Sequence, residues 1–475
     1  MTTARDSVSS PPRTYVIFAI VAGSMLIASI DGSIVSVALR TLETELDTSL
    51  AWIGWMLTAY SLAQVSVMPL AGKLSDEWGR KRVFLISVAL FTGGSIASGF
   101  APNIYVLMVC RTIQALGGGA FFPSAVGIIS ETFGARRQTF VGLFSSVVPL
   151  GSIIGPNIGG VIVDHLSWRC LFFFNAPIGV VVLLAGLRYL PKSAPKGGRH
   201  GLDLRGTGLF VGGVGAILYA MATVANSGGD AARADVWALL ALGVGLLIAF
   251  WRHESRTATP LMDLQLLKWR PLLAANIYNF IYGACVFGFF QFIPYYAQVG
   301  YGMSASQSGA ILTPRSVTMA LFAAASSFLI VRTGYRRPML AASLILSLSL
   351  LLLGLGLRHV SIFGQGIPIS VWLGLIVGFA GAGFGMGSPA STNATLDLVP
   401  DKAAAITGIR GMFRQTGGTV GTAIVVLALS LTPDKRAGMQ HIFLALSAGL
   451  LLTVPLIFMI PDTAMARRRS KQARG

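Results

Sequence analysis

The chain has 475 residues, of which 54% are hydrophobic and only 11% are charged. This balance excludes an ordinary water-soluble domain and is typical of a protein that lies in lipid. The formal net charge of +18 does not require a nucleic-acid partner, because the cytoplasmic loops of membrane proteins concentrate Lys and Arg. The 3 cysteines lie far apart and offer neither a metal-ligand spacing nor a clear disulfide pair.

Apolar runs of about 20 residues recur along the chain, and each is long enough to cross a bilayer as a helix. Of the 36 lysines and arginines, 26 fall in segments that are cytoplasmic if both termini lie inside, and 6 fall in the opposite connections. The positive-inside rule therefore predicts a multi-pass protein of the bacterial inner (cell) membrane with both termini in the cytoplasm. We predict fourteen membrane-spanning helices, at residues 14–39, 51–72, 83–101, 104–129, 138–163, 168–190, 206–226, 235–251, 271–297, 305–331, 338–357, 367–394, 403–430 and 440–460.

The sequence also repeats itself. A shift of 266 residues places seven residues with special backbone or packing roles on similar residues, for example Gly117 on Gly383 and Gly119 on Gly385. Parallel repeats of six helices are a transporter architecture. We therefore predict an all-α polytopic membrane protein with two six-helix bundles in a pseudo-twofold arrangement and two inserted central helices. The expected parts are a cytoplasmic arm (1–13), an N-terminal bundle (14–190), linkers with the inserted pair (191–270), a C-terminal bundle (271–460) and a basic cytoplasmic tail (461–475).

Asp31, in the first predicted span, is the only carboxylate that we place in the hydrocarbon region of any span. A buried carboxylate is costly unless it takes up a proton or pairs with a cation, and such residues often mark proton pathways. We predict that Asp31 couples transport to protons, with Arg111 of the fourth span as its partner. Gln114 lies on the same helix face as Arg111, and we assign it to the substrate pocket. The alternative is a permanent ion pair that only sets helix packing.

A polar turn follows the second predicted span, with the sequence GKLSDEWGRKR. We predict that a cytoplasmic charge cluster of Asp76, Arg80 and Glu131 gates the transporter, holding the outward-facing state and breaking on opening. Because surface ion pairs are individually weak, such a gate needs a network or a helix terminus. The turn also acts as a positive-inside topology signal. The predicted gating residues are Gly72, Asp76, Gly79, Arg80, Arg82 and Glu131.

The fifth predicted span carries glycines at intervals that put them on one side of the helix. Small residues at this spacing allow close helix approach, and a proline bends the helix. We predict that this segment seals the two halves against proton leak; ordinary close packing is the alternative. The residues are Gly151, Gly155, Pro156, Gly159 and Gly160.

The ninth predicted span carries an aromatic stripe at helical spacing. A stripe of this kind could form one wall of a central cavity that binds flat amphiphiles, or it could face lipid or a neighbouring helix. Its members are Tyr278, Tyr282, Phe289, Phe292 and Tyr296. We assign Tyr282 and Phe289 to the substrate pocket, together with the nearby Asn276 and Asn279.

Arginines outnumber carboxylates in the spans. Arg315, Arg410 and Arg414 join Arg111 there, against the single carboxylate Asp31. A multiply charged cation would be repelled by this balance, so neutral, zwitterionic or anionic amphiphiles are the favoured substrates. We assign Arg315 and Arg414 to the substrate pocket, with a scaffold role as the alternative for Arg414.

Four motifs together resemble the major facilitator superfamily, and specifically its fourteen-span drug:proton antiporter branch. They are GKLSDEWGRKR at 72–82, RTIQALG at 111–117, GSIIGPNIGG at 151–160, and Trp168-Arg169 followed by NAPIG at 175–179. Asp31 resembles the acidic first-span signature of the branch, although Arg40 stands here where the branch usually has proline. The resemblance implies that Arg111 takes part in proton transfer. It also implies an antiporter rather than a symporter, because the 151–160 motif marks antiporters in this family.

The sequence therefore predicts a proton-coupled secondary antiporter that exports hydrophobic or amphiphilic small molecules, such as drugs or antibiotics, by alternating access. The chain carries no GxxxxGK[ST], HExxH or GxSxG motif, so we expect no enzyme activity and no cofactor, only a proton gradient as the driving force. The expected partners are the substrate and membrane lipid, without nucleic acid; the sequence leaves open a periplasmic adaptor. The competing functions are a facilitator or symporter for a nutrient or metabolite, and a non-transporting sensor.

Overall fold

The computed structural model describes residues 11–191, 203–257, 264–357, 360–362, 365–399 and 403–462. Most of the predicted arm, nearly all of the tail and most of the first linker lie outside these residues. Within the described part, every long element is a helix, and the strands are one short antiparallel hairpin of β1 (Val360–Ile362) and β2 (Gln365–Ile367). The predicted all-α class is confirmed.

The first bundle contains the first six predicted spans. Two of these spans are each divided into two helices, 138–163 into α6 and α7 and 168–190 into α8 and α9. The second span continues as a helix past its predicted end at residue 72. The elements are α1 (Pro11–Ile34), η1 (Val35–Val37), α2 (Leu39–Glu45), α3 (Leu50–Trp78), α4 (Arg80–Gly99), α5 (Ile104–Phe133), η2 (Gly134–Arg136), α6 (Arg137–Ser145), α7 (Val147–His165), α8 (Arg169–Phe173) and α9 (Asn175–Tyr189).

The remaining elements form the inserted pair and the second bundle. The inserted pair is α10 (Leu204–Asn226) and α11 (Ala234–Glu254), and a short helix, α12 (Leu264–Leu267), leads into the second bundle. That bundle consists of α13 (Arg270–Phe290), α14 (Ile293–Tyr301), α15 (Ala305–Ala310), α16 (Leu312–Thr333), α17 (Arg336–Gly354), α18 (Ile369–Leu398), α19 (Ala403–Ser430), α20 (Lys435–Leu451) and α21 (Thr453–Met459).

Thirteen segments among the described residues are helical, long enough and apolar enough to cross a membrane. They correspond to thirteen of the fourteen predicted spans. The other predicted span, 305–331, is formed by α15 and α16. The 22 residues of α16 would reach about 33 Å at the usual helical rise, which is enough to cross a hydrocarbon core of about 30 Å.

The internal repeat is visible in the packing. In the first bundle, Gly117 of α5 faces the backbone of Ser87 and Phe91 of α4. In the second bundle, Gly383 of α18 faces Ala342 and Leu346 of α17. These two residues lie 255 positions after Ser87 and Phe91, the same shift that places Gly79 on Gly334. The missing side chains allow two helices to approach closely in both places. Helix neighbours repeat as well: α1 packs on α7 as α13 packs on α19, and α3 packs on α5 as α16 packs on α18.

The inserted pair lies beside the junction of the two bundles. Its helix α10 contacts both α3 of the first bundle and α19 of the second. Val214 and Leu218 of α10 pack in one cluster with Ala423 of α19. The second helix, α11, packs mainly on α10 and has the smallest buried share of all the candidate spans. We therefore expect α11 to face lipid.

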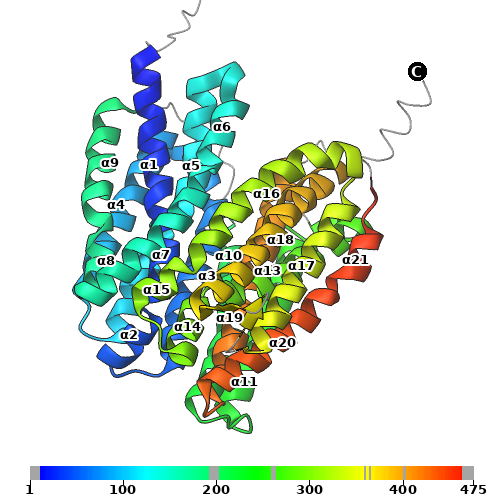
Figure 1. Ribbon diagram of the computed structural model, residues 1–475. Coiled ribbons are helices and arrows are strands. Elements are labelled where there is room, and N and C mark those ends of the chain that lie inside the picture. Colours follow the sequence, from blue (N-terminus) through cyan, green and yellow to red (C-terminus); the bar gives the residue numbers. More distant parts are fainter. Residues whose placement is uncertain are drawn as a thin grey trace, which may run out of the picture.

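The two bundles meet more closely at one end of the molecule than at the other. Figure 1 shows the bundles side by side, with the start of α1 and the end of α21 both toward the upper side. We call this the termini end; there, α5 and α6 stand apart from α16 and α18. At the opposite end, which we call the contact end, α14 touches α2 and α15 touches α7.

Candidate functional site

Asp31 lies in the last turn of α1 and has no exposed surface. Its carboxylate accepts hydrogen bonds from side chains on three other helices. Arg111 Nη1 lies 2.8 Å from Oδ1 and 2.7 Å from Oδ2. Gln114 Nε2 donates to Oδ1 at 2.9 Å, Tyr60 Oη donates to Oδ2 at 2.9 Å, and Asn175 Nδ2 donates to Oδ1 at 3.0 Å. We call these five residues the Asp31 cluster.

Arg111 is as well enclosed as the carboxylate that it contacts, with an exposed fraction of 2%. Its Nη1 also donates to Gln114 Oε1 at 2.8 Å, and its guanidinium lies 4.0 Å from the centre of the Tyr60 ring. The predicted contact between Asp31 and Arg111 is therefore present. Gln114, which we assigned to the substrate pocket, is fully buried and bonded to Asp31 instead.

Tyr60 and Asn175 belong to the cluster although no sequence pattern assigned them to it. Tyr60 comes from α3, and Asn175 is the first residue of α9, where its Nδ2 also lies 3.2 Å from Ser95 Oγ of α4. Both are neutral polar residues, which are tolerated in many places inside membrane bundles. The one available signal was the position of Asn175 in the NAPIG motif.

The cluster is electrically balanced and closed. One carboxylate faces one guanidinium, and the neutral donors saturate the carboxylate oxygens. Breaking a buried pair by removing the charge of one partner is strongly unfavourable, because the other charge is left uncompensated. Protonation of Asp31 in this arrangement would leave the Arg111 charge without its partner.

The glycine-rich face of α7 packs mainly on α1 and only partly on the other bundle. A side chain at Gly151, Gly155 or Gly159 would collide with α1, close to Asp31. A side chain at Gly160 would collide with backbone atoms of Ala305 and Ser306 on α15. The segment thus holds α1 in place inside its own bundle, and its far end forms part of the interface between the halves.

Hydrogen bonds join the two bundles at the contact end. Asp164 of α7 accepts from the backbone N–H groups of Ala305 at 3.0 Å and Ser306 at 2.8 Å. Arg40 donates to the carbonyl oxygen of Gln298 of α14 at 3.0 Å. These bonds connect segments of different bundles and hold this end together.

Glu43 adds a titratable group at the same end, outside the membrane-spanning segments. Tyr295 Oη of α14 donates to Glu43 Oε2 of α2 at 3.1 Å. Burial raises the pKa of Glu43 above its ordinary value, although the hydrogen bond from Tyr295 opposes this shift. The contact end therefore contains a carboxylate that holds its proton more tightly than a solvated glutamate does.

The predicted gate is organised differently from our expectation. The helix α3 includes Gly72 and ends only at Gly79, whose φ of 88° lies in the left-handed region that favours glycine. Arg80 Nε lies 3.2 Å from Glu131 Oε1, and Arg80 Nη1 also donates to the carbonyl oxygen of Gly127. The side chain of Asp76 lies outside the described part of the structure.

The Arg80–Glu131 pair does not hold the two halves together. Both residues belong to the first bundle, where the pair fixes the start of α4 to the end of α5. The pair is intact although α5 and α16 stand apart at the termini end (Figure 1). The contact that we predicted between Arg80 and Glu131 is present, and its role in gating stays a prediction. Arg82 is exposed and lies 5.9 Å from the ring centre of Trp78, within one bundle.

Most of the predicted aromatic wall is packed inside the second bundle. Phe289 and Phe292 have no exposed surface, and Phe289 packs against Phe443 of α20. Asn276 and Asn279 are also buried, and each donates to a backbone carbonyl of its own helix, α13. The alternative reading, in which the stripe faces neighbouring helices, holds for these residues. Tyr282, at 3% exposed, is buried as well.

The predicted pocket arginines Arg315 and Arg414 are half-buried on α16 and α19. Both lie over phenylalanine rings: Arg315 is 4.5 Å from the ring centre of Phe290, and Arg414 is 5.8 Å from that of Phe287. The structure therefore places these two arginines beside the aromatic residues of α13, and not beside the Asp31 cluster.

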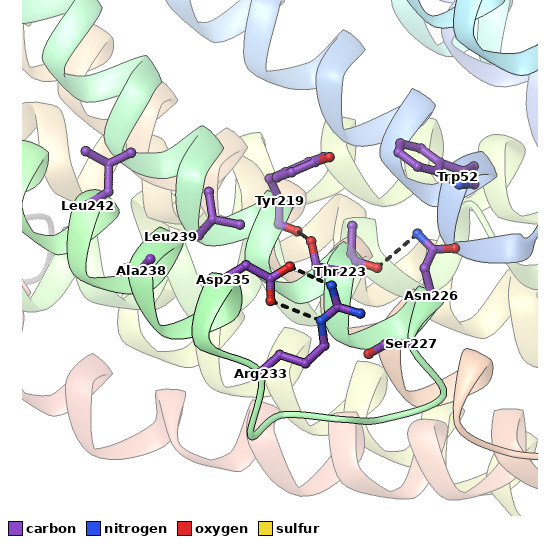
Figure 2. A pocket seen from close by; sticks show the side chains of 11 residues that line it. Trp52, Tyr219, Thr223, Asn226, Ser227, Arg233, Asp235, Ala238, Leu239 and Leu242 are labelled. Atoms are coloured by element: carbon purple, nitrogen blue, oxygen red, sulfur yellow. Dashed lines mark hydrogen bonds and ion pairs between the residues drawn. The ribbon is translucent and has the colours of Figure 1, made fainter.

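A separate cavity of about 570 Å³ lies between α3 and the inserted pair. Figure 2 shows its polar side, where Arg233 and Asp235 face each other. Arg233 Nε and Nη2 donate to the two Asp235 oxygens at 3.0 and 2.7 Å. Trp52, Tyr219 and Leu242 line the rest. No residue of this cavity belongs to the Asp31 cluster.

Comparison with known proteins identifies a matching family and several similar proteins. The model of the Major Facilitator Superfamily matches residues 21–422. The tetracenomycin C resistance and export protein of Streptomyces glaucescens is 30% identical over 431 residues, which are 89% of this chain and 78% of that protein. The multidrug transporter protein MdtP of Bacillus subtilis is 29% identical over 420 residues, or 87% of this chain and 74% of that protein.

Solved structures agree with this fold. A bacterial homologue of the human lysosomal transporter Spinster, in an inward-facing and occupied conformation, superposes with a TM-score of 0.70 at 13% identity and covers 95% of this chain and 97% of that chain. The xylose transporter XylE from E. coli, in a partially occluded inward-open conformation, gives a TM-score of 0.62 at 13% identity, with coverages of 95% and 99%. At such low identity these likenesses concern the fold alone.

Proposed function

This chain belongs to the Major Facilitator Superfamily and is a multi-pass membrane transporter; from that premise we propose that it exports hydrophobic or amphiphilic small molecules in exchange for protons. The names of its relatives support an export role, because they include a tetracenomycin C resistance and export protein and a puromycin resistance protein. Fold alone would not support a substrate class, since one fold serves many functions.

The single observation that carries the proposal is the Asp31 cluster. A carboxylate with no exposed surface, paired with one arginine inside a membrane bundle, has two stable conditions. It is either ionised and bound to Arg111, or protonated after separation from Arg111. A group that exchanges a proton only when its helices move can link proton passage to the rocking of the bundles.

The proposed cycle uses these two conditions. In the outward-facing form the substrate leaves and Asp31 takes up a proton. The bundles then rock, the contact end closes, and substrate entering from the cytoplasm releases the proton on that side. The ionised Asp31–Arg111 pair accompanies the return. With the termini in the cytoplasm, the closed contact end corresponds to an inward-facing conformation, as in the two solved relatives by fold.

We further propose that the protein lies in the bacterial inner membrane, that it needs no cofactor, and that the proton gradient drives transport. The basic segments near the predicted cytoplasmic connections support the orientation. Its partners in this proposal are the small-molecule substrate and membrane lipid.

The test uses purified protein in liposomes with an internal pH indicator and an imposed proton gradient. Three probes share one ring system and differ in charge: anthracene carboxylate, anthracene carboxamide and anthracenylmethylammonium. We expect at least one probe to cause proton flux, and we expect Asp31→Asn to reduce that flux to the level of empty liposomes.

The matched control is Asp230→Asn, which removes an exposed carboxylate between α10 and α11. It should retain the wild-type flux. Full proton-coupled flux in Asp31→Asn would contradict the proposed mechanism, and flux of a probe without proton movement would indicate a facilitator.

A further inference from the structure

The second bundle contains buried positive charge that no described carboxylate balances. Among the described residues, no ion pair includes Arg315, Arg410 or Arg414. Arg410 is only 7% exposed. Its Nη2 makes one long hydrogen bond of 3.5 Å to the carbonyl oxygen of Ser388, and its Nε has no hydrogen-bond partner in the described part of the chain.

Two tyrosine hydroxyls lie in the same region. Tyr278 and Tyr282 of α13 are 1% and 3% exposed, and their rings stack with centres 5.5 Å apart. Neither hydroxyl forms a hydrogen bond of good geometry with a described residue, although the Tyr278 hydroxyl lies near Ser343. Buried polar groups normally find partners, so two such hydroxyls beside an unsatisfied guanidinium require an explanation.

A glycine of α18 brings these groups to one point. A Cβ atom at Gly387 would lie 3.2 Å from Tyr282 Oη and 3.6 Å from Tyr278 Oη. Both hydroxyls therefore point at the bare side of Gly387. The next residue, Ser388, supplies the carbonyl oxygen that Arg410 touches. Three donor groups from two helices thus converge on one turn of α18.

An aromatic cluster leads from this point to the bundle surface. The half-buried Phe384 of α18 lies 5.9 Å from Tyr282, 6.0 Å from Phe287 and 6.3 Å from Phe290, measured between ring centres. Arg414 is one helical turn from Arg410, half-buried, and lies over Phe287. The helix α19, which carries both arginines, contacts the first bundle through α3.

We infer that Arg410 and Arg414, with the hydroxyls of Tyr278 and Tyr282, bind the acidic group of an aromatic substrate anion. This inference rests on the proposed export function and specifies its substrate class. Arg414 at the surface would receive the carboxylate or ionised phenol, Arg410 and the two hydroxyls would complete its hydrogen bonds, and the rings would stack on the aromatic body.

A purely structural role explains the same residues less well. A structural arginine inside a membrane bundle finds acceptors among its neighbours, as Arg111 does with Asp31 and Gln114. Arg410 has a single long hydrogen bond to a backbone carbonyl and no ion pair with a described carboxylate. A ligand that brings negative charge would remove this imbalance, because unpaired charge is costly in a medium of low polarity.

The substrate charge has an electrical consequence. The exit of one anion and the entry of one proton carry two elementary charges in the same direction across the membrane. The exchange of a neutral substrate for one proton carries one charge, and the exchange of a cation for one proton carries none. A potential that is negative inside should therefore accelerate export of the anion more than export of a neutral analogue.

The experiment measures equilibrium binding of the fluorescent probes anthracene carboxylate and anthracene carboxamide to the purified full-length protein. We expect the carboxylate to bind at least about tenfold more tightly than the carboxamide. In Arg414→Gln this preference should fall to about twofold or less, while the carboxamide affinity remains unchanged. Arg256→Gln removes an exposed arginine after α11 and should retain the full preference.

Two further variants distinguish the loss of the anion site from a folding defect. Tyr282→Phe removes only a hydroxyl, and we expect it to weaken carboxylate binding more than carboxamide binding, because hydrogen bonds to charged groups are stronger. Arg410→Gln should behave like Arg414→Gln, with carboxamide binding as the proof of folding. Equal affinities of the two probes in the wild type, or a preference that persists in both arginine variants, would overturn the inference.

Failure of this inference differs from failure of the proposed function. Proton flux driven by the carboxamide or the ammonium probe, without a carboxylate preference, would leave antiport intact and remove only the anion site. Absence of proton flux with all three probes, despite selective carboxylate binding, would instead refute proton antiport.

Discussion

The two bundles share one architecture but differ in how they treat buried charge. In the first bundle, Asp31 and Arg111 form a balanced pair that neutral donors enclose. In the second bundle, Arg410 has a single long hydrogen bond, and no described carboxylate pairs with it. The glycine contacts that set helix packing are repeated, whereas the buried charged residues are not. The repeat therefore provides the scaffold, and its differences provide the chemistry.

The largest expected effect follows from removing one charge of the Asp31–Arg111 pair in the first bundle. Arg111→Met leaves the Asp31 carboxylate buried and unpaired, so we expect the protein to lose about 3–5 kcal/mol of stability. Thermal unfolding in detergent measures this loss. The double variant Asp31→Asn with Arg111→Met should recover most of it, because no charge is then left unpaired. An additive double variant would show that the two residues do not act as a pair.

A smaller loss of stability is expected when one neutral hydrogen-bond donor of the Asp31 cluster is removed. Tyr60→Phe deletes the hydrogen bond to Asp31 Oδ2, and hydrogen bonds to charged groups contribute about 1.5–3 kcal/mol. Because that bond stabilises the ionised carboxylate, proton-coupled flux should also shift its pH dependence toward higher pH. The control is Tyr219→Phe, whose ring is exposed at the inserted pair. An unchanged pH profile in Tyr60→Phe would mean that Tyr60 is not coupled to the proton site.

Removal of a buried arginine charge from the second bundle should raise the stability of the protein instead of lowering it. Arg410→Met removes a buried charge that has no carboxylate partner, so the empty protein should gain stability, on the order of 1–3 kcal/mol. The same variant should lose the preference for anthracene carboxylate. Thermal unfolding without ligand tests the first part. A loss of stability as large as that of Arg111→Met would show that both bundles use arginine in the same structural way.

The smallest expected effect concerns the contact end. Burial raises the pKa of Glu43 above its ordinary value, so the closed contact with Tyr295 binds a proton more tightly than a solvated glutamate would. Closure is then favoured at low pH and weakens as the pH rises through the raised pKa, above the ordinary value of about 4.3. Glu43→Gln should make closure independent of pH in that range. Distances between spin labels on α2 and α14 measure this, and an unchanged pH dependence would contradict it.

How far the sequence predicted this molecule depends on the kind of residue. A carboxylate in hydrocarbon needs a partner, so Asp31 could be paired with Arg111 before any coordinates were known. Tyr60 and Asn175 carry no charge, and only the packing of α3 and α9 against α1 reveals their place. Likewise, the spacing of Tyr282 and Phe289 defines a helix face but cannot say which helix lies opposite it.

The gate illustrates a second limit of the sequence. The polar run from Gly72 predicts a connection outside the membrane, but polar residues can continue a helix into water. The structure extends α3 until Gly79, where the backbone conformation favours glycine and ends the helix. Opposite charge predicted the pairing of Arg80 with Glu131, whereas charge alone could not indicate that the pair joins two helices of one bundle.

The central claim is that Asp31 carries the exchanged proton. The most direct measurement counts the protons released into weakly buffered detergent solution when anthracene carboxylate binds to the purified protein. Because only protein whose Asp31 already carries a proton can release one, the protein is first equilibrated at low pH. We expect release in the wild type and none in Asp31→Asn, although the variant still binds the probe. Undiminished proton release from Asp31→Asn would contradict the claim, because another group would then have to supply the proton.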